Sequence, residues 1–402
     1  MNLVLFMFSL SVLLLVAIVS GHLIQKVKMP KITGEVFGGI ILGPTILGTL
    51  FPEIYNWLFF YSHSIVAARE MFLKLCALLI LFVIGLEVDL SEITRLRRTV
   101  LWTSFFGLAP PFFLGMASVL VFPGLWGCNP SGSTWLLPLF VGTALSISAL
   151  PVIARILADL GMLRSKIGSV ILATATIDDI VGWIFFALIS AYFIPGSLAD
   201  MNPFVTIGGV LTMFLVAMAF GNKLTKRFID WCEPNEDFDN LFLGLTIVLV
   251  LIFSVFAQRI GIHETLGAFL VGLGLSNCER HKMYDPLRKA VMSLFSPLYF
   301  VSICLGVNLA QNFDLMLAVL VLAIATIGKV GGIWLGAKCS RLGTRESLAV
   351  GFGMNARGAV GIILITSGYE AGILDAKAYG ALLLMAVATS ILSGPIMKKV
   401  LA

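Results

Sequence analysis

Residues 167–186 read IGSVILATATIDDIVGWIFF, an apolar stretch long enough to cross a bilayer, with the adjacent carboxylates Asp178 and Asp179 near its middle. An ionised acid at that depth costs roughly 2.5 to 3.5 kcal/mol on insertion scales. A membrane segment tolerates such a pair when the carboxylates face a wet cavity and bind protons or cations. The alternative is a structural ion pair, but two acids need two basic partners at that depth. Lys329 and Arg357 are the candidates.

The composition indicates a polytopic membrane protein. Of the 402 residues, 59% are hydrophobic and 12% are charged, and the mean hydropathy is +1.01. A soluble globular domain has about twice that charged fraction. The first apolar run, 2–24, has no basic residue before it and no cleavage site after it, so we expect a retained span rather than a signal peptide. The six cysteines lack metal-ligand spacing and are expected to pack as apolar residues.

Charged and Gly/Pro-rich breaks divide the chain into about thirteen predicted helices, each near the ~20 residues that a span requires. The predicted spans are 2–24, 34–50, 71–90, 99–121, 133–157, 166–193, 204–222, 239–257, 262–276, 288–308, 314–338, 347–370 and 376–398.

The distribution of Lys and Arg predicts the orientation. The connections on one side hold 21 of these 27 residues, whereas the opposite connections hold only Arg69, Arg259 and Lys377. By the positive-inside rule, the N-terminus is expected outside and the C-terminus in the cytoplasm of a cell (inner) membrane. The net charge of +5 then reflects the basic residues that orient the chain in the membrane, and no nucleic-acid partner is expected.

The chain repeats itself weakly at an interval of seven predicted helices. Residues 81–90, LFVIGLEVDL, resemble 300–309, FVSICLGVNL, and the glycine spacing of 38–43 recurs at 267–272. An odd interval places the second copy upside down relative to the first. The predicted fold class is therefore an all-α polytopic membrane protein with inverted-topology repeats, in which a substrate site lies near the midplane where the repeats meet.

Two predicted spans are interrupted. Residues 142–151 read GTALSISALP, in which Pro151 lacks a backbone donor. Residues 351–358 read GFGMNARG, in which the glycines, Gly358 among them, and Asn355 weaken the helix. Unwound backbone is tolerated in a membrane only where it lines a cavity or is buried in protein, and its free carbonyls suit a dehydrated monovalent cation. A plain proline kink is the alternative for the first interruption.

These segments resemble the second family of monovalent cation:proton antiporters, which are membrane transporters similar to sodium/proton exchangers. The resemblance rests on SISALPVIARIL at 146–157, ATIDDIVGW at 175–183, GKVGG at 328–332 and MNARG at 354–358. The motifs agree with the family in order and spacing, and the resemblance runs through nearly the whole chain.

The resemblance implies a division into domains. Dimerisation-domain helices would lie in 1–98 and 239–310, core-domain helices in 99–193 and 311–402, and a linker helix in 194–238. The two broken helices would cross in the core, which would move like an elevator against the dimerisation domain of a homodimer. Many relatives carry a cytoplasmic regulatory domain after the last span. This chain stops at Ala402, so a separate regulatory subunit would have to supply such control.

The same resemblance implies a role for each matched residue. Asp179 corresponds to the carboxylate that binds either a proton or a cation. Asp178 stands where sodium/proton antiporters carry an acid and several potassium exporters or electroneutral relatives carry Gln or Asn. Lys329 matches a basic residue that can pair with the first Asp, and Arg357 either neutralises carbonyl ends at the second break or is a structural charge. The further oxygen ligands would be Thr143, Ser146, Ser148, Thr176 and the carbonyls of 143–148.

The expected chemistry is competition between protons and a hard cation at one coupled pair of acids. The expected activity is antiport of a monovalent cation against protons, with Na+ as the first candidate cation. Transport would be electrogenic if Lys329 also releases a proton. K+/H+ exchange and electroneutral exchange are the alternatives. No cofactor and no enzymatic chemistry are expected, and the partners are the cation, protons and the lipid bilayer.

Other classes fit the residues less well. An intramembrane aspartyl protease places its two acids on separate helices, and a membrane prenyltransferase needs further acids one turn on, which 181–186 lacks. The four histidines are scattered without metal-ligand spacing. A cation channel is not separated from an exchanger by sequence alone.

Overall fold

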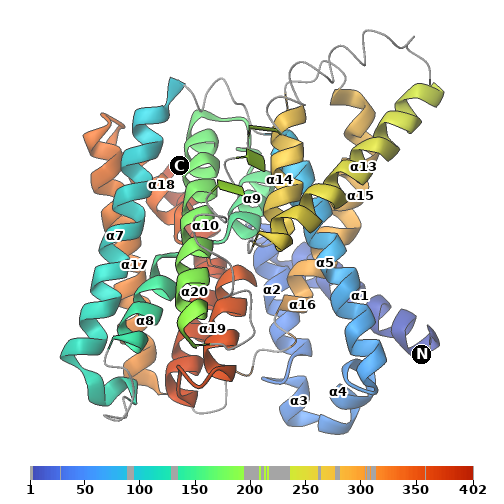
Figure 1. Cartoon of the computed structure of the whole chain (residues 1–402). Coiled ribbons are helices and arrows are strands. Elements are labelled where there is room, and N and C mark those ends of the chain that lie inside the picture. Colours follow the sequence, from blue (N-terminus) through green and yellow to red (C-terminus); the bar gives the residue numbers. More distant parts are fainter. Residues whose placement is uncertain are drawn as a thin grey trace.

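A computed structural model of the chain describes residues 3–27, 29–87, 95–127, 135–193, 236–260, 264–276, 281–303, 314–357 and 359–401, together with the short pieces 208–209, 212–213, 215–216, 305 and 308. In these residues the regular structure is entirely helical (Figure 1). This confirms the predicted all-α class.

The described helices follow the predicted spans. The first part of the chain forms α1 (Leu3–Lys26), α2 (Lys31–Leu42), α3 (Leu47–Leu50), α4 (Pro52–Phe59), α5 (His63–Leu86), α7 (Arg97–Val121), η1 (Pro123–Trp126), α8 (Leu136–Ser146), α9 (Leu150–Asp159) and α10 (Lys166–Phe193). The second part forms α13 (Glu236–Arg259), α14 (Glu264–Leu275), η4 (His281–Tyr284), α15 (Asp285–Ala290), the π-helix η5 (Val291–Phe295), α16 (Ser296–Ile303), α17 (Leu315–Cys339), α18 (Thr344–Met354), α19 (Ala359–Glu370) and α20 (Ala376–Leu401). The predicted span 204–222 lies largely outside the described residues.

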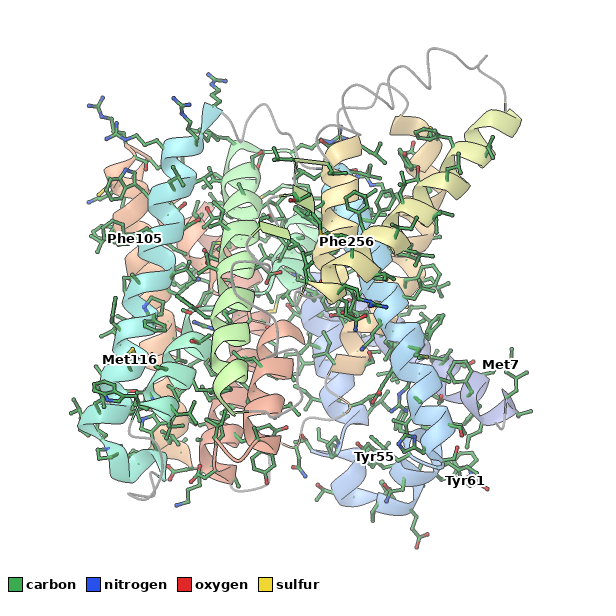
Figure 2. The ribbon with its side chains drawn as sticks, in the orientation of Figure 1. Met7, Tyr55, Tyr61, Phe105, Met116 and Phe256 are labelled. Atoms are coloured by element: carbon green, nitrogen blue, oxygen red, sulfur yellow. The ribbon has the colours of Figure 1, made fainter. Side chains whose placement is uncertain are left out.

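The outer surface of the bundle is apolar. Within the described residues, seven helices or helix pairs are long and apolar enough to cross a membrane. Large apolar side chains project from them, such as Met7 on α1, Phe105 on α7 and Phe256 on α13, all more than half exposed (Figure 2). Tyr55 instead is buried, and its hydroxyl donates to the carbonyl of Leu305 over 2.6 Å. An apolar exterior around a buried polar interior is expected for a chain whose solvent is lipid.

Two predicted boundaries are wrong, and one of the two places a buried arginine inside a helix. The span predicted at 71–90 begins at His63, after Ser62 caps the helix by accepting from the Ile65 amide. Arg69, counted above as a loop charge, therefore lies inside α5, where its Nη1 donates to the Phe59 carbonyl over 2.7 Å. The span predicted at 34–50 is divided into α2 and α3, because Gly43 leaves the helix in an extended conformation.

The described helices pack as two groups. The broken-helix group contains α7–α10 and α17–α20, with α17 lying along α7 and against α18 and α20. The flanking group contains α1–α5 and α13–α16, in which α5 packs on α14 and α1 packs on α2 and α16. Figure 1 shows α7, α8 and α17 on the left and α1, α13 and α14 on the right. The groups meet where α2 and α5 contact α9, and where α2 contacts α20.

Gly328 on α17 allows this helix to approach α7 closely, beside a charged residue. A Cβ added to Gly328 would lie 2.9 Å from the Cα of Pro111 on α7, so only glycine permits this approach of the two helices. Lys329 follows directly and is fully buried. The close packing of α7 on α17 therefore holds an ammonium group inside the broken-helix group.

Candidate functional site

The first broken helix consists of α8 and α9. Helix α8 ends at Ser146, and Ile147 and Ala149 adopt extended conformations before α9 begins at Leu150. Pro151 lies in the first turn of α9, where the missing N–H removes no helical hydrogen bond. The proline thus begins the second half-helix, and the interruption itself lies just before it.

The second broken helix consists of α18 and α19. Helix α18 ends at Met354, and Asn355 is its C-cap. Helix α19 begins at Ala359. Gly358, which the sequence analysis singled out as a helix breaker, lies outside the described residues.

The two interruptions cross. The amide of Ala149 donates to the carbonyl of Ala356 over 3.0 Å, and the hydroxyl of Ser148 donates to the carbonyl of Met354 over 2.9 Å. Backbone groups that the broken helices release are therefore partly satisfied by each other, which is how irregular backbone is tolerated at membrane depth.

Arg357 supports the same crossing. Its guanidinium donates to the carbonyl of Leu145, at the end of α8, and to Oδ1 of Asn355 over 3.2 Å. Asn355 in turn donates from Nδ2 to the Thr326 hydroxyl over 3.3 Å. The Ser390 hydroxyl donates to the Arg357 carbonyl. A buried cation at this place offsets the partial negative charge of the carbonyl end of α8.

Asp178, on α10, lies beside the crossing and is paired. Its Oδ2 lies 2.6 Å from Nζ of Lys329, and both side chains are fully buried. The same ammonium donates to the carbonyl of Ser146 over 2.7 Å. The hydroxyl of Ser148 lies 3.5 Å from Oδ2 of Asp178, a long contact. Lys329 thus joins the Asp178 carboxylate to the carbonyl end of α8.

Asp179 has a different environment, although it is the next residue. Its side chain is buried, and its Oδ1 has no hydrogen-bond partner among the described residues; the same holds for Oδ1 of Asp178. A buried carboxylate oxygen without a partner is costly. A proton or a cation bound there would remove that cost.

The other predicted oxygen ligands bond to their own helices. Thr143 donates to the Leu139 carbonyl, Ser146 donates to the Thr143 carbonyl, and Thr176 donates to the Leu172 carbonyl, all within 2.9 Å. Each hydroxyl has used its proton, so only its oxygen lone pairs are available for a cation. Of the predicted hydroxyl ligands, Ser148 is the one with a contact to the acid pair among the described residues.

A buried ion cluster was missed by the sequence analysis. Arg155, one of the 21 basic residues that predicted the orientation, lies inside α9 with its side chain 5% exposed. Its Nη2 lies 3.1 Å from Oε1 of Glu35 on α2, and its Nε lies 3.3 Å from Oδ1 of Asp159. Asp159 also accepts from the Ile32 amide over 3.1 Å. The signals were an acid inside the apolar run 34–50 and the i,i+4 spacing of Arg155 and Asp159.

The geometry can support ion exchange. Two adjacent carboxylates are buried, one of them paired with an ammonium, and carbonyl and hydroxyl oxygens of two interrupted helices lie beside them. Among the described residues, no group of three or more His, Cys, Asp and Glu side chains could hold a metal ion. A cation bound at the acid pair would therefore take its remaining ligands from hydroxyl and carbonyl oxygens, which suits a hard monovalent ion.

Comparison with known proteins gives consistent results. The family profile described as "Sodium/hydrogen exchanger, transmembrane" matches residues 10–402. The chain is 31% identical to Cation/H(+) antiporter 18 of Arabidopsis thaliana over 95% of its own length and 47% of the relative's, so it spans about half the length of that relative. It is 27% identical to the Na(+)/H(+) antiporter NhaS4 of Synechocystis sp., with 94% of this chain and 93% of the relative covered.

A solved structure shares the fold. The sodium proton antiporter MjNhaP1 from Methanocaldococcus jannaschii superimposes with a TM-score of 0.66 at 17% identity, covering 99% of this chain and 97% of the other. This match confirms the antiporter-like helical fold, and the family profile confirms the resemblance inferred from the motifs. The chain belongs to the sodium/hydrogen exchanger family.

Proposed function

We propose that the chain is a secondary active antiporter that exchanges a monovalent cation for protons by alternating access. Na+ is the first candidate for this cation. The observation that carries the proposal is the pair of buried carboxylates at the crossing of two broken helices. Asp178 is paired with Lys329, whereas the side chain of Asp179 has no ion pair or hydrogen bond among the described residues. Family membership supports the same reaction, since several relatives are named as cation/proton antiporters.

Exchange follows from competition at this site. In the protonated state, Asp179 holds a proton, and Asp178 is balanced by Lys329. When the site opens to the opposite side, Asp179 releases the proton and its oxygens accept a cation. A bound proton or a bound cation cancels the charge of one carboxylate, which lowers the cost of moving the site through a low-dielectric region. The unloaded site, with an exposed charge, moves less readily, and this difference couples the two ions.

Lys329 decides the stoichiometry of the proposed cycle. A cation that binds both carboxylates competes with the ammonium for Asp178 Oδ2. A lysine released from that contact would be a buried cation next to another cation, so it loses its proton. Two protons then exchange for one cation, and transport is electrogenic. If the Asp178–Lys329 pair persists throughout the cycle, the exchange is instead electroneutral.

The proposed moving unit is the broken-helix group. Its helices pack mainly on one another, and its contacts with the flanking group run through α2, α5, α9 and α20. This packing supports the division into a core domain and a dimerisation domain. The proposed assembly is a homodimer whose core domain slides past the flanking helices, with the N-terminus outside and the C-terminus in the cytoplasm.

The choice of Na+ over K+ rests on Asp178. A second carboxylate gives the site more negative charge for a small, strongly hydrated ion, whereas several potassium-exporting or electroneutral relatives carry an uncharged amide there. The oxygen ligands themselves do not distinguish Na+, Li+ and K+. K+/H+ exchange is therefore the second candidate.

Reconstitution in liposomes tests the proposal. Purified protein is incorporated with an internal pH dye, and Na+, Li+ or K+ is added outside at equal ionic strength. An antiporter produces cation-dependent proton movement, and Na+ is expected to give the lowest half-saturating concentration. Cation flux without a stoichiometric counter-flow of protons would identify a channel instead. A response to K+ alone would overturn the Na+ assignment and leave the exchange mechanism standing.

A further inference from the structure

A charged cavity lies at the junction of the two helix groups, away from the acid pair. Its volume is about 670 Å³, and its charged lining consists of five basic side chains and two acidic ones. The wall contributed by the broken-helix group is α9 and the turn before α10. The opposite wall is the start of α2, α15 and the π-helix η5.

Glu87 organises the arginines of this cavity. Its side chain is 5% exposed, and its two oxygens accept from different helices: Oε2 lies 2.9 Å from Nε of Arg164, and Oε1 lies 2.7 Å from Nη1 of Arg288. The two arginine side chains are 62% and 42% exposed. Within the described residues, Arg164 uses only Nε and Arg288 only Nη1, so their other N–H groups are available. One buried carboxylate thus orients two guanidinium groups that still have donors to offer.

Two ammonium groups add to the excess of positive charge. Lys31 and Lys289 line the same cavity, are exposed, and form no ion pair or side-chain hydrogen bond within the described part of the chain. The two acids of the lining are already engaged: Glu87 by both arginines, and Asp159 by Arg155 and the Ile32 amide. The lining of the cavity therefore keeps an excess of basic over acidic side chains.

The backbone near the cavity is held in place. Nη1 of Arg155 donates to the carbonyl of Met292 over 3.0 Å, across the junction of the two groups. Met292 lies in the π-helix η5, a rare form that interrupts the chain α15–η5–α16 and is frequent at functional sites. Buried contacts thus preorganise the part of the lining that contains Arg155, Arg164 and Arg288, and the two exposed lysines lie beside it.

We propose that this cavity is a binding site for a phosphate-bearing anion. Guanidinium groups with two free N–H donors bind phosphate oxygens in a bidentate manner, and ammonium groups add charge at the rim. Basic pockets between membrane helices bind anionic headgroups in the same way. The phosphate can belong to a lipid headgroup or to a soluble phosphate compound. In either case the anion touches both helix groups and stabilises the arrangement seen here, which makes the cavity a control point for movement of the broken-helix group.

Binding is measured without reference to transport. The full chain is purified in a neutral detergent, and thermal unfolding is followed by tryptophan fluorescence during titration with inorganic pyrophosphate, with chloride keeping the ionic strength constant. A second arm places the protein in phosphatidylcholine nanodiscs with or without phosphatidylglycerol. The test variant is Lys31→Gln/Lys289→Gln, which leaves the Glu87 contacts intact. The control variant is Arg345→Gln/Lys399→Gln, which removes the same charge from exposed positions outside the cavity.

The expected result is a saturable rise of the unfolding midpoint in the wild type and in the control, with an affinity weaker by at least about tenfold in the test variant. A rise produced by phosphatidylglycerol alone, and lost in the test variant, identifies the ligand as a lipid headgroup. The proposal is overturned if neither pyrophosphate nor phosphatidylglycerol raises the midpoint, or if the test and control variants respond equally.

Discussion

The ammonium of Lys329 lies 2.6 Å from Oδ2 of Asp178, while Oδ1 of the adjacent Asp179 has no hydrogen-bond partner among the described residues. Two neighbouring carboxylates on one helix are therefore unequal. The first is balanced by a fixed cation, and the second depends on what binds to it. In the proposed cycle, this asymmetry gives the exchange of proton for cation to Asp179 and the tuning of that exchange to Asp178 and Lys329.

Asp179→Asn is expected to abolish exchange, because the amide keeps the shape of the side chain and cannot titrate. Cation-dependent proton movement in liposomes should fall to the level of empty vesicles, while the protein remains monodisperse on size exclusion. Asp314→Asn is the matched control: Asp314 caps α17 by accepting from the Leu317 amide, and asparagine caps helices equally well. Persistent exchange in Asp179→Asn would remove Asp179 from the mechanism.

Lys329→Gln is expected to change the electrical behaviour of transport. The wild type should respond to a membrane potential clamped with valinomycin, since two protons exchange for one cation. The glutamine variant keeps a donor for the Ser146 carbonyl and loses the titrating charge. It should be either inactive or electroneutral with a weaker dependence on pH. Wild-type Na+ flux that is insensitive to the clamped potential would contradict the two-proton cycle.

Glu35→Gln is expected to destabilise the chain by about 3 kcal/mol, because it leaves the buried Arg155 guanidinium with one acid fewer. Chemical unfolding in detergent measures the change. The control is Glu346→Gln, whose partner Lys166 lies 3.9 Å away with both side chains more than one third exposed, so the cost there should be about 0–1 kcal/mol. Equal losses in the two variants would show that the Glu35–Arg155 pair contributes nothing beyond a surface contact.

The residues that the sequence identified share one property. Asp178, Asp179 and Lys329 are charged residues inside long apolar runs. A charge at membrane depth has a high free-energy cost, so the position of these residues along the chain was sufficient to identify them. Their mutual arrangement came from the family resemblance and not from spacing, because Asp178 and Lys329 are 151 residues apart.

The residues that the sequence analysis missed depend on tertiary contacts. Arg155 reads as one more charge at the end of a span until α2 places Glu35 against it from 120 positions away. Pro151 indicated the correct region for the first break, but a proline is accepted in the first turn of a helix, so the chain unwinds at Ile147–Ala149 instead. The local sequence locates charged residues and helix-breaking residues. The packing of distant helices decides which charged residues pair.

The predicted orientation in the membrane determines which helix ends a reagent added outside the cell can label. In a cysteine-free background, a cysteine replacing Lys377, at the start of α20, should react with a membrane-impermeant maleimide added outside whole cells. A cysteine replacing Arg97, at the start of α7, should react only after the cells are opened. The reason is the excess of basic residues on the Arg97 side. The reverse pattern would place the N-terminus in the cytoplasm.

Ser148→Ala tests whether the crossing supplies a cation ligand. Its hydroxyl donates to the Met354 carbonyl and lies 3.5 Å from Oδ2 of Asp178, so its oxygen is the hydroxyl oxygen nearest to the acid pair in the described contacts. Removing it should raise the half-saturating Na+ concentration about tenfold, with a smaller effect on the maximal rate. Ser393→Ala is the control, since Ser393 is equally buried and bonds to the Thr389 carbonyl of its own helix α20. A lower maximal rate at unchanged half-saturation would instead mean that Ser148 only joins the two broken helices and contributes no ligand.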